Sequence, residues 1–185
     1  PGHGMPPPWW HERIRGPFPR GQMVQFNTVN GAGHKVICNI SDQTTPAYLG
    51  GPEDHVSMFA SSGTAESPIL IAYNKIRGGG PSSSGGGALA GDYGGSHITI
   101  QGNILVNPGA YGLAIAGGTH HKILDNQIYS PEPFAWSNNG LFVWGQGNTT
   151  DPSTCNGHEV RRNRVYFVHR DGYANAGWNP GNCGD

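Results

Sequence analysis

A short pattern that recurs five times along the chain most restricts the folds open to it. Each copy is a strand-like run that ends in Asn, followed by a spacer and usually an aliphatic residue. The Asn residues of the five copies are Asn39, Asn74, Asn103, Asn126 and Asn163. They are 35, 29, 23 and 37 positions apart, whereas the strands of a sandwich are joined by hairpins with turns of two residues. The pattern therefore predicts stacked coils, with 23 residues as the bare coil and loops inserted in the longer ones.

A second strand-like run precedes each of these motifs, at residues 23–27, 55–59, 87–91, 112–116 and 140–144. Together the runs indicate an all-β chain folded as a right-handed parallel β-helix, a solenoid of about five coils. We expect the recurring Asn side chains to stack at roughly the 4.8 Å strand spacing and to hydrogen-bond to one another. We also expect each Asn to adopt the left-handed backbone conformation at a tight corner.

Alternation along the strands predicts which side chains point into the core. These inward side chains are aliphatic or Met, namely Val56, Met58, Ile71, Ile76, Ile98, Ile100, Leu113, Ile115, Ile123, Ile128, Leu141 and Val143. The chain also holds 31 Gly and 15 Pro, a level at which low-complexity disorder is a first suspicion. Apolar runs punctuated by Gly and Asn argue instead for many short strands.

Charge and hydropathy exclude two classes of partner. The chain has 11 Lys and Arg against 12 Asp and Glu, so it lacks the basic surface that nucleic acid requires. No apolar run approaches the roughly 20 residues that span a bilayer, so we expect no membrane insertion.

The composition divides the chain into two parts. Residues 1–20 form a Pro-rich N-terminal arm, and residues 21–185 form the β-helix domain with a Gly/Asn-rich C-terminal tail. The arm cannot form a helix that caps the first coil, because Pro breaks helices. An uncovered coil is a sheet edge that invites pairing, so we expect the chain to belong to a longer helix or to associate end to end.

The three cysteines bear on the compartment. Cys155 lies in a polar loop and Cys183 in the tail, where a free thiol gains little from burial. We expect a Cys155–Cys183 disulfide with Cys38 free, and the alternative is three unpaired thiols. A disulfide would favour a protein that works outside the cytoplasm.

Residues 94–130, GGSHITIQGNILVNPGAYGLAIAGGTHHKILDNQIYS, carry a resemblance to a known group. Here the chain resembles the secreted right-handed parallel β-helix proteins of the pectate-lyase-like superfamily, and the likeness covers about residues 21 to 183. The resemblance specifies a fold, and it implies a carbohydrate ligand because the superfamily includes polysaccharide lyases and glycoside hydrolases. It also includes non-catalytic adhesins, which keeps a structural role open.

The expected function is recognition of an extracellular polysaccharide by a secreted, cell-surface or periplasmic protein. Cleavage of an acidic polysaccharide, by β-elimination or hydrolysis, is the reaction that the resemblance implies. The alternative is a non-catalytic structural or adhesive subunit of a surface fibre.

Three acidic residues are candidates for the chemistry. Glu53, Asp54 and His55 open the second coil just before a strand, where the lyases that this chain resembles hold calcium or activate a base. Asp54 would be a general base, His55 a proton carrier, and Glu53 with Asp54 a calcium site. Asp92 follows the first strand of the third coil in the sequence GDYGG, whose glycines let a ligand approach. The alternatives are a solvated acidic turn and an Asx turn.

Cations and histidines supply further candidates. Lys75 and Arg77 flank Ile76, so both point outward, and in the resembling lyases such a cation neutralises the carboxylate of a uronic acid. The alternative for both is an exposed strand face. His120 and His121 lie at a turn without further metal ligands at a recognised spacing, so we expect both to be exposed.

Aromatic residues at turns and strand ends complete the candidates. Tyr111, Trp144 and Trp178, together with Tyr93 and Trp136, offer planar amphipathic rings that suit the apolar faces of sugars. The alternative is that these rings cover loops and the C-terminal end of the solenoid.

Overall fold

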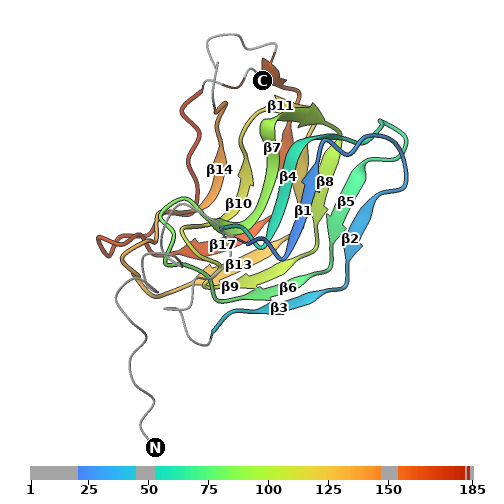
Figure 1. The fold of residues 1–185 in the computed structure, drawn as a ribbon. Helices are drawn as coiled ribbons and strands as arrows, with labels where there is room; N and C mark the ends of the chain where they lie inside the picture. Colours follow the sequence, from blue (N-terminus) through green and yellow to red (C-terminus); the bar gives the residue numbers. More distant parts are fainter. Residues whose placement is uncertain (1–20, 45–52, 147–153, 182, 184–185) are drawn as a thin grey trace, which may run out of the picture.

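In the part of the chain that the structure describes, seventeen strands wind into a right-handed parallel β-helix of five coils (Figure 1). This is a computed structural model, and it describes residues 21–44, 53–146, 154–181 and Cys183. The predicted fold class is confirmed, and every pair of named strands is parallel. The predicted N-terminal arm, residues 1–20, lies outside the described residues.

The coils present three sheets, which we name A, B and C. Sheet A is the largest, and its main path runs through β1 (Val24–Asn27), β4 (Val56–Ser62), β7 (Gly86–Ser96), β10 (Tyr111–Ile115) and β14 (Asn139–Val143). Two short strands lie beside this path, β11 (Gly118–Thr119) and β15 (Cys155–Asn156). The strands of this path correspond to the five first runs that the sequence predicts.

The run that contains each Asn divides into two strands, so the coil has a triangular path with three sides (Figure 1). The strands before the Asn form sheet B: β2 (Lys35–Ile37), β5 (Ile69–Ala72), β8 (Ile98–Gln101), β12 (Lys122–Leu124) and β16 (Glu159–Arg161). The strands after it form sheet C: β3 (Ile40–Asp42), β6 (Lys75–Arg77), β9 (Ile104–Val106), β13 (Gln127–Ser130) and β17 (Arg164–Phe167).

The five Asn side chains form a continuous ladder at the corner between sheets B and C. The Oδ1 atom of Asn103 accepts from the backbone N–H and the Nδ2 of Asn74, both at 2.9 Å. The same double contact joins Asn39 to Asn74, Asn103 to Asn126, and Asn126 to Asn163. The predicted stack is confirmed, and its amides are satisfied although its middle members are buried.

The prediction that these Asn residues adopt the left-handed conformation is wrong, because that conformation occurs one residue earlier. The residue before each Asn takes the positive φ, between 56° and 64°, at Cys38, Tyr73, Gly102, Asp125 and Arg162. The corner turns at that residue, and the Asn that follows is thereby aimed along the ladder. Asn is selected for its amide, which can donate and accept, and not for its tolerance of the left-handed region.

The predicted core lies inside the solenoid. Eleven of the twelve predicted residues are buried, and Leu141 is a partly buried residue packed against them. Phe167 and Val36 add to the same cluster. The alternation of strand residues therefore gave the correct inward face in coils two to five, where the predicted residues lie.

The C-terminal tail adds one more rung to sheet A. The backbone N–H of Trp178 donates to the carbonyl of Leu141, and the N–H of Val143 donates to the carbonyl of Trp178. Cys155 and Cys183 form the expected disulfide, and Cys38 is free and exposed. The tail is thus held to the last coil by backbone hydrogen bonds and by a covalent bond. No described segment forms a helix with the length and hydropathy needed to cross a membrane.

The ladder predicts a position-dependent cost of removing its amides. Asn103→Ala would leave buried partners in the coils on either side unpaired, so we expect the free energy of unfolding to fall by at least about 3 kcal/mol. Asn39→Ala, at the exposed first rung, is the matched control and should cost much less. Denaturant unfolding of both variants measures the difference, and equal losses would contradict the ladder's role.

Candidate functional site

Asp54 and Tyr111 meet at the start of sheet A, although they lie two coils apart. The Tyr111 hydroxyl donates a hydrogen bond to Asp54 Oδ1, which also accepts from the N–H of Gly86 at 3.0 Å. Gly86 occupies the coil between them, and a Cβ there would lie 2.6 Å from the Tyr111 ring. The missing side chain at Gly86 therefore lets the phenol reach the carboxyl group.

Burial controls the protonation of this pair. Asp54 and Tyr111 are each only 4% exposed, and loss of solvent raises the pKa of Asp54 to about 7. The hydrogen bonds from Tyr111 and Gly86 act in the opposite direction, because they stabilise the carboxylate. Burial, and then the charge of Asp54, raises the pKa of Tyr111 well above its ordinary value. The phenol is therefore a donor, and the carboxyl group titrates near neutral pH.

Two further carboxyl groups act on this pair. The charges of Glu53 and Asp92 both help to raise the pKa of Asp54, so the acidic candidates converge as a group. Asp92 is partly buried on β7, and burial raises its own pKa. Glu53 accepts hydrogen bonds from the hydroxyls of Ser82 and Ser84. Asp92 is the member of the group that combines an outward position with partial exposure.

The register of β7 explains the position of Asp92. Phe59 in β4 pairs with Asp92, whereas Ser57 pairs with Leu89, so β7 carries one extra residue between these pairs. Gly91, with φ of 74°, lies within this bulge. Asp92 thereby joins the outward row that begins with Asn27 and Phe59.

His55 lies inside the solenoid and not on its surface. Its Nδ1 accepts from the Ser41 hydroxyl and its Nε2 donates to the Gly78 carbonyl, both at 2.7 Å. The ring is 1% exposed, and burial lowers its pKa, so it stays neutral. In this position His55 fastens three coil segments together and is shielded from a surface ligand.

The expected calcium site has few assembled ligands. Among the described residues, one cluster brings three possible metal ligands within 4.8 Å of one another. Its members are Cys155, His158 and Cys183. Glu53 and Asp54 are not part of such a group, although calcium requires six to eight oxygen ligands. Two of the three grouped ligands are the disulfide cysteines.

Lys75 and Arg77 lie on the outer face of sheet C, away from the acidic group on sheet A. Both side chains are exposed, and Arg77 contacts Asp42 at 3.8 Å. The charges that shift the pKa of Asp54 are acidic, and these two cations are not among them. The structure therefore does not bring the expected base and the expected charge-neutralising cations together.

Two pairs of aromatic rings lie on sheet A, one beside Asp92 and one at the C-terminal end. Phe59 and Tyr93 pack with ring centroids 4.8 Å apart, and Tyr93 is exposed. Trp144 and Trp178 form a second pair at 5.6 Å and are 36% and 46% exposed. Tyr111, expected as a sugar platform, is instead buried against Phe142. Two of the three rings expected to bind substrate thus remain accessible.

The expectation for the His pair is half wrong. His120 is exposed, but His121 is fully buried and stacks on His158 with centroids 5.4 Å apart. Burial, with the nearby His158 and His97, lowers the pKa of His121 to about 3. Its Nδ1 accepts the N–H of Ile98, so the neutral ring joins two coils. The alternation that places Ile123 inside also places His121 inside, and this was the signal available in the sequence.

No family model matches the chain, and no curated protein or solved structure matches it either. The parallel β-helix itself rests on the three stacked sheets described above.

The raised pKa of Asp54 predicts a pH-dependent stability. The folded-state pKa of about 7 exceeds the value of about 3.9 in an unfolded chain, so the stability contributed by the protonated carboxyl is complete below about pH 4. It is lost as the pH rises through 7. Asp54→Asn keeps an oxygen acceptor but does not titrate. Relative to the wild type, its free energy of unfolding should therefore rise by up to about 4 kcal/mol between pH 4 and pH 8.

Denaturant unfolding at several pH values measures this difference, with exposed Glu66→Gln as the control. Parallel stability curves for Asp54→Asn and the wild type would show that Asp54 is ionised throughout this range.

Proposed function

We propose that the chain binds an extracellular polysaccharide along the outer face of sheet A. The observation that carries the proposal is two aromatic pairs on sheet A: Phe59 with Tyr93 beside the partly buried Asp92, and the exposed Trp144 with Trp178 at the C-terminal end. Aromatic faces pack on the C–H surfaces of sugar rings, and a carboxyl group accepts from their hydroxyls. A polymer that crosses the coils would meet the first pair on β4 and β7 and the second pair at β14 and the C-terminal rung.

Hydrolysis is the better supported of the two reactions. Hydrolysis needs a carboxyl group that protonates the departing glycosidic oxygen, and burial raises the pKa of Asp92 in the direction that this role requires. β-Elimination of a uronic acid instead calls for a cation beside the base, and Lys75 and Arg77 lie on sheet C. In this proposal Asp92 contacts the substrate, while Asp54 and Tyr111 lie behind it as positioning residues.

Two features support an extracellular setting and membership of the pectate-lyase-like superfamily. The Cys155–Cys183 disulfide fits an oxidising compartment. The parallel solenoid is the architecture that the sequence resemblance implies.

A panel of soluble neutral and acidic polysaccharides tests the site, with binding measured by affinity electrophoresis. We expect the double variant Trp144→Ala/Trp178→Ala to bind at least roughly tenfold more weakly, because it loses both exposed rings of one pair. Tyr73→Ala, an exposed tyrosine at the corner between sheets B and C, is the matched control and should bind normally.

Asp92→Asn separates binding from cleavage. We expect it to bind the polysaccharide but release no new reducing ends, and wild-type products should lack the ultraviolet absorbance of an unsaturated sugar. Cleavage that survives in Asp92→Asn would overturn the assigned role, and an unsaturated product would replace hydrolysis with β-elimination.

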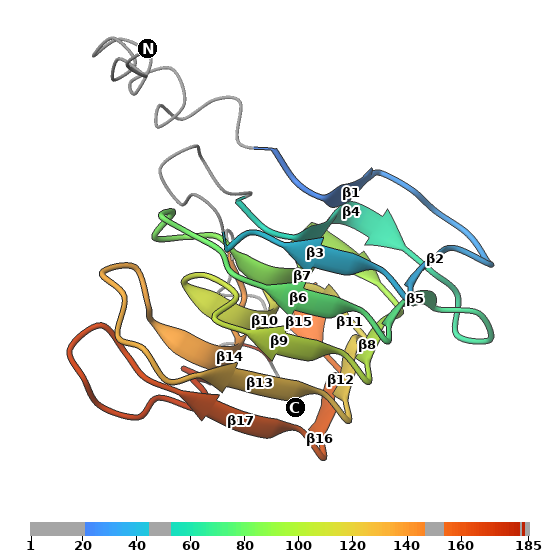
Figure 2. The same cartoon turned by 90° about the horizontal axis from the view of Figure 1, so that it is seen from below.

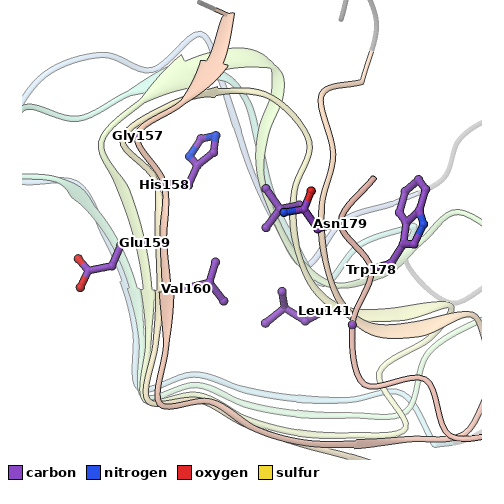
Figure 3. A pocket seen from close by; sticks show the side chains of 9 residues that line it. Leu141, Gly157, His158, Glu159, Val160, Trp178 and Asn179 are labelled. Carbon is purple, nitrogen blue, oxygen red and sulfur yellow. The ribbon is translucent and has the colours of Figure 1, made fainter. Parts of the chain in front are cut away.

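A second candidate function, a subunit that stacks end to end, is favoured by the C-terminal end of the solenoid. A hollow of about 890 Å³ lies there. Figure 3 shows that Val160 and Leu141 project into it while Glu159 points outward. Val160 is an inward residue of β16, yet 41% of it is exposed. An apolar core layer left open in this way can be covered by another coil.

Sedimentation velocity over a range of concentrations tests stacking. Val160→Asp should abolish any self-association of the wild type, because it places a charge on the surface that another coil would cover. A wild type that remains monomeric at high concentration would contradict this function and leave the polysaccharide proposal standing.

A further inference from the structure

The outer face of sheet C carries a groove that the proposed site on sheet A does not use. One hollow of about 320 Å³ lies over β9, β13 and β17, and a second of about 490 Å³ lies beside it toward the loops that follow β6 and β13. Val106 and Tyr129 line both hollows, so the two adjoin along these residues. Figure 2 shows the five strands of sheet C side by side on this face.

Aromatic rings form the floor of this sheet C groove. Tyr129 and Tyr166 are cross-strand partners on neighbouring coils, and their rings stack with centroids 5.6 Å apart. They are 55% and 51% exposed, so their outer surfaces are available. At the loop end, Phe134 and Trp136 lie parallel, with centroids 5.2 Å apart. A Cβ at Gly80 would lie 2.3 Å from the Trp136 indole, so the ring rests directly on that backbone.

The charges around the groove are predominantly positive. Lys75, Arg77 and Arg164 point outward from sheet C, and Asp42 is the acidic residue among its outward positions. Three cations and one anion give a local charge of +2, or +1 when Glu132 at the loop end is included, on a chain whose net charge is −1. The Arg77–Asp42 pair is exposed at 3.8 Å and so neutralises Arg77 only weakly.

The strand register of sheet C places its outward side chains in two rows that cross the coils, which is the direction that a bound polymer would follow. Lys75, Ile104, Gln127 and Arg164 are successive partners in one outward row. Arg77, Val106, Tyr129 and Tyr166 form the neighbouring outward row. A polymer lying across the coils would therefore meet aromatic rings on one side and hydrogen-bonding or cationic side chains on the other.

We propose that the sheet C groove binds an acidic polysaccharide, with Tyr129 and Tyr166 as platforms and Arg77 and Arg164 as partners of its carboxylates. The inference rests on the proposed function in that both surfaces take glycans, but it shares no residue with the site on sheet A. It gives Lys75 and Arg77 a role in binding, apart from the acidic group around Asp54. A chain with both surfaces would bind one polysaccharide segment on sheet A and a second polysaccharide segment on sheet C.

The test is affinity electrophoresis through gels that contain alginate, a polyuronate, or neutral dextran, with EDTA present to exclude bridging calcium. The wild type should be retarded by alginate and not by dextran. Tyr129→Ala/Tyr166→Ala should weaken alginate binding at least roughly tenfold, because both platforms are removed. Arg164→Gln should weaken it less and reduce its salt dependence. Tyr73→Ala again serves as the control with an exposed tyrosine outside the groove.

The outcomes separate the two surfaces. Alginate binding that is unchanged in the double Tyr variant overturns the groove, and equal retardation by dextran overturns the acidic class. Loss of alginate binding in Trp144→Ala/Trp178→Ala with normal binding in the Tyr variant would assign the polymer to sheet A alone. Self-association that is lost in the Tyr variant, without alginate binding by the wild type, would show a protein interface instead. Thermal unfolding confirms that each variant is folded.

Discussion

The double hydrogen bond between asparagines of successive coils is the contact on which the rest of the solenoid depends. Parallel strands have no tight turn between them to fix their alignment, and a slip of one residue would turn every inward side chain outward. Each Oδ1 accepts two N–H groups from the preceding Asn, which leaves one alignment that satisfies the buried amides. Hydrogen bonds from Nδ2 to backbone carbonyls of the preceding coil complete the fit.

A register fixed at one corner leaves the other corners free to vary. The steps between successive Asn residues range from 23 to 37 residues, yet the same inward rows are kept in all coils. One extra residue lies in the bulge of β7, where it positions Asp92. The triangular path then gives the outer faces different chemistry. Acidic groups and aromatic pairs lie on sheet A, and cations with stacked tyrosines lie on sheet C.

The sequence predicted the parts of the structure that depend on strand alternation and on the Asn repeat. It predicted the core around Ile115, the Asn stack and the disulfide, because each follows from local pattern or residue type. It could not predict that Tyr111 is buried, since this requires the absence of a side chain at Gly86, a coil away. It also could not separate Lys75 and Arg77 from Asp54, because that depends on where the coil bends. The coil bends at each Asn, where the run that contains it divides into a strand of sheet B and a strand of sheet C.

The disulfide has a mechanical consequence. Cys155 and Cys183 close a loop with a sequence separation of 28, and this loop contains β16, β17 and the Trp178 rung. Tension applied to the chain beyond Cys183 passes through the sulfur atoms directly to Cys155. The strands inside the loop therefore carry no load, and the first elements to feel the pull are β15 and, before it, β14. A solenoid joined in this way resists peeling of its last coil, which would be useful to a protein that holds a polymer under strain.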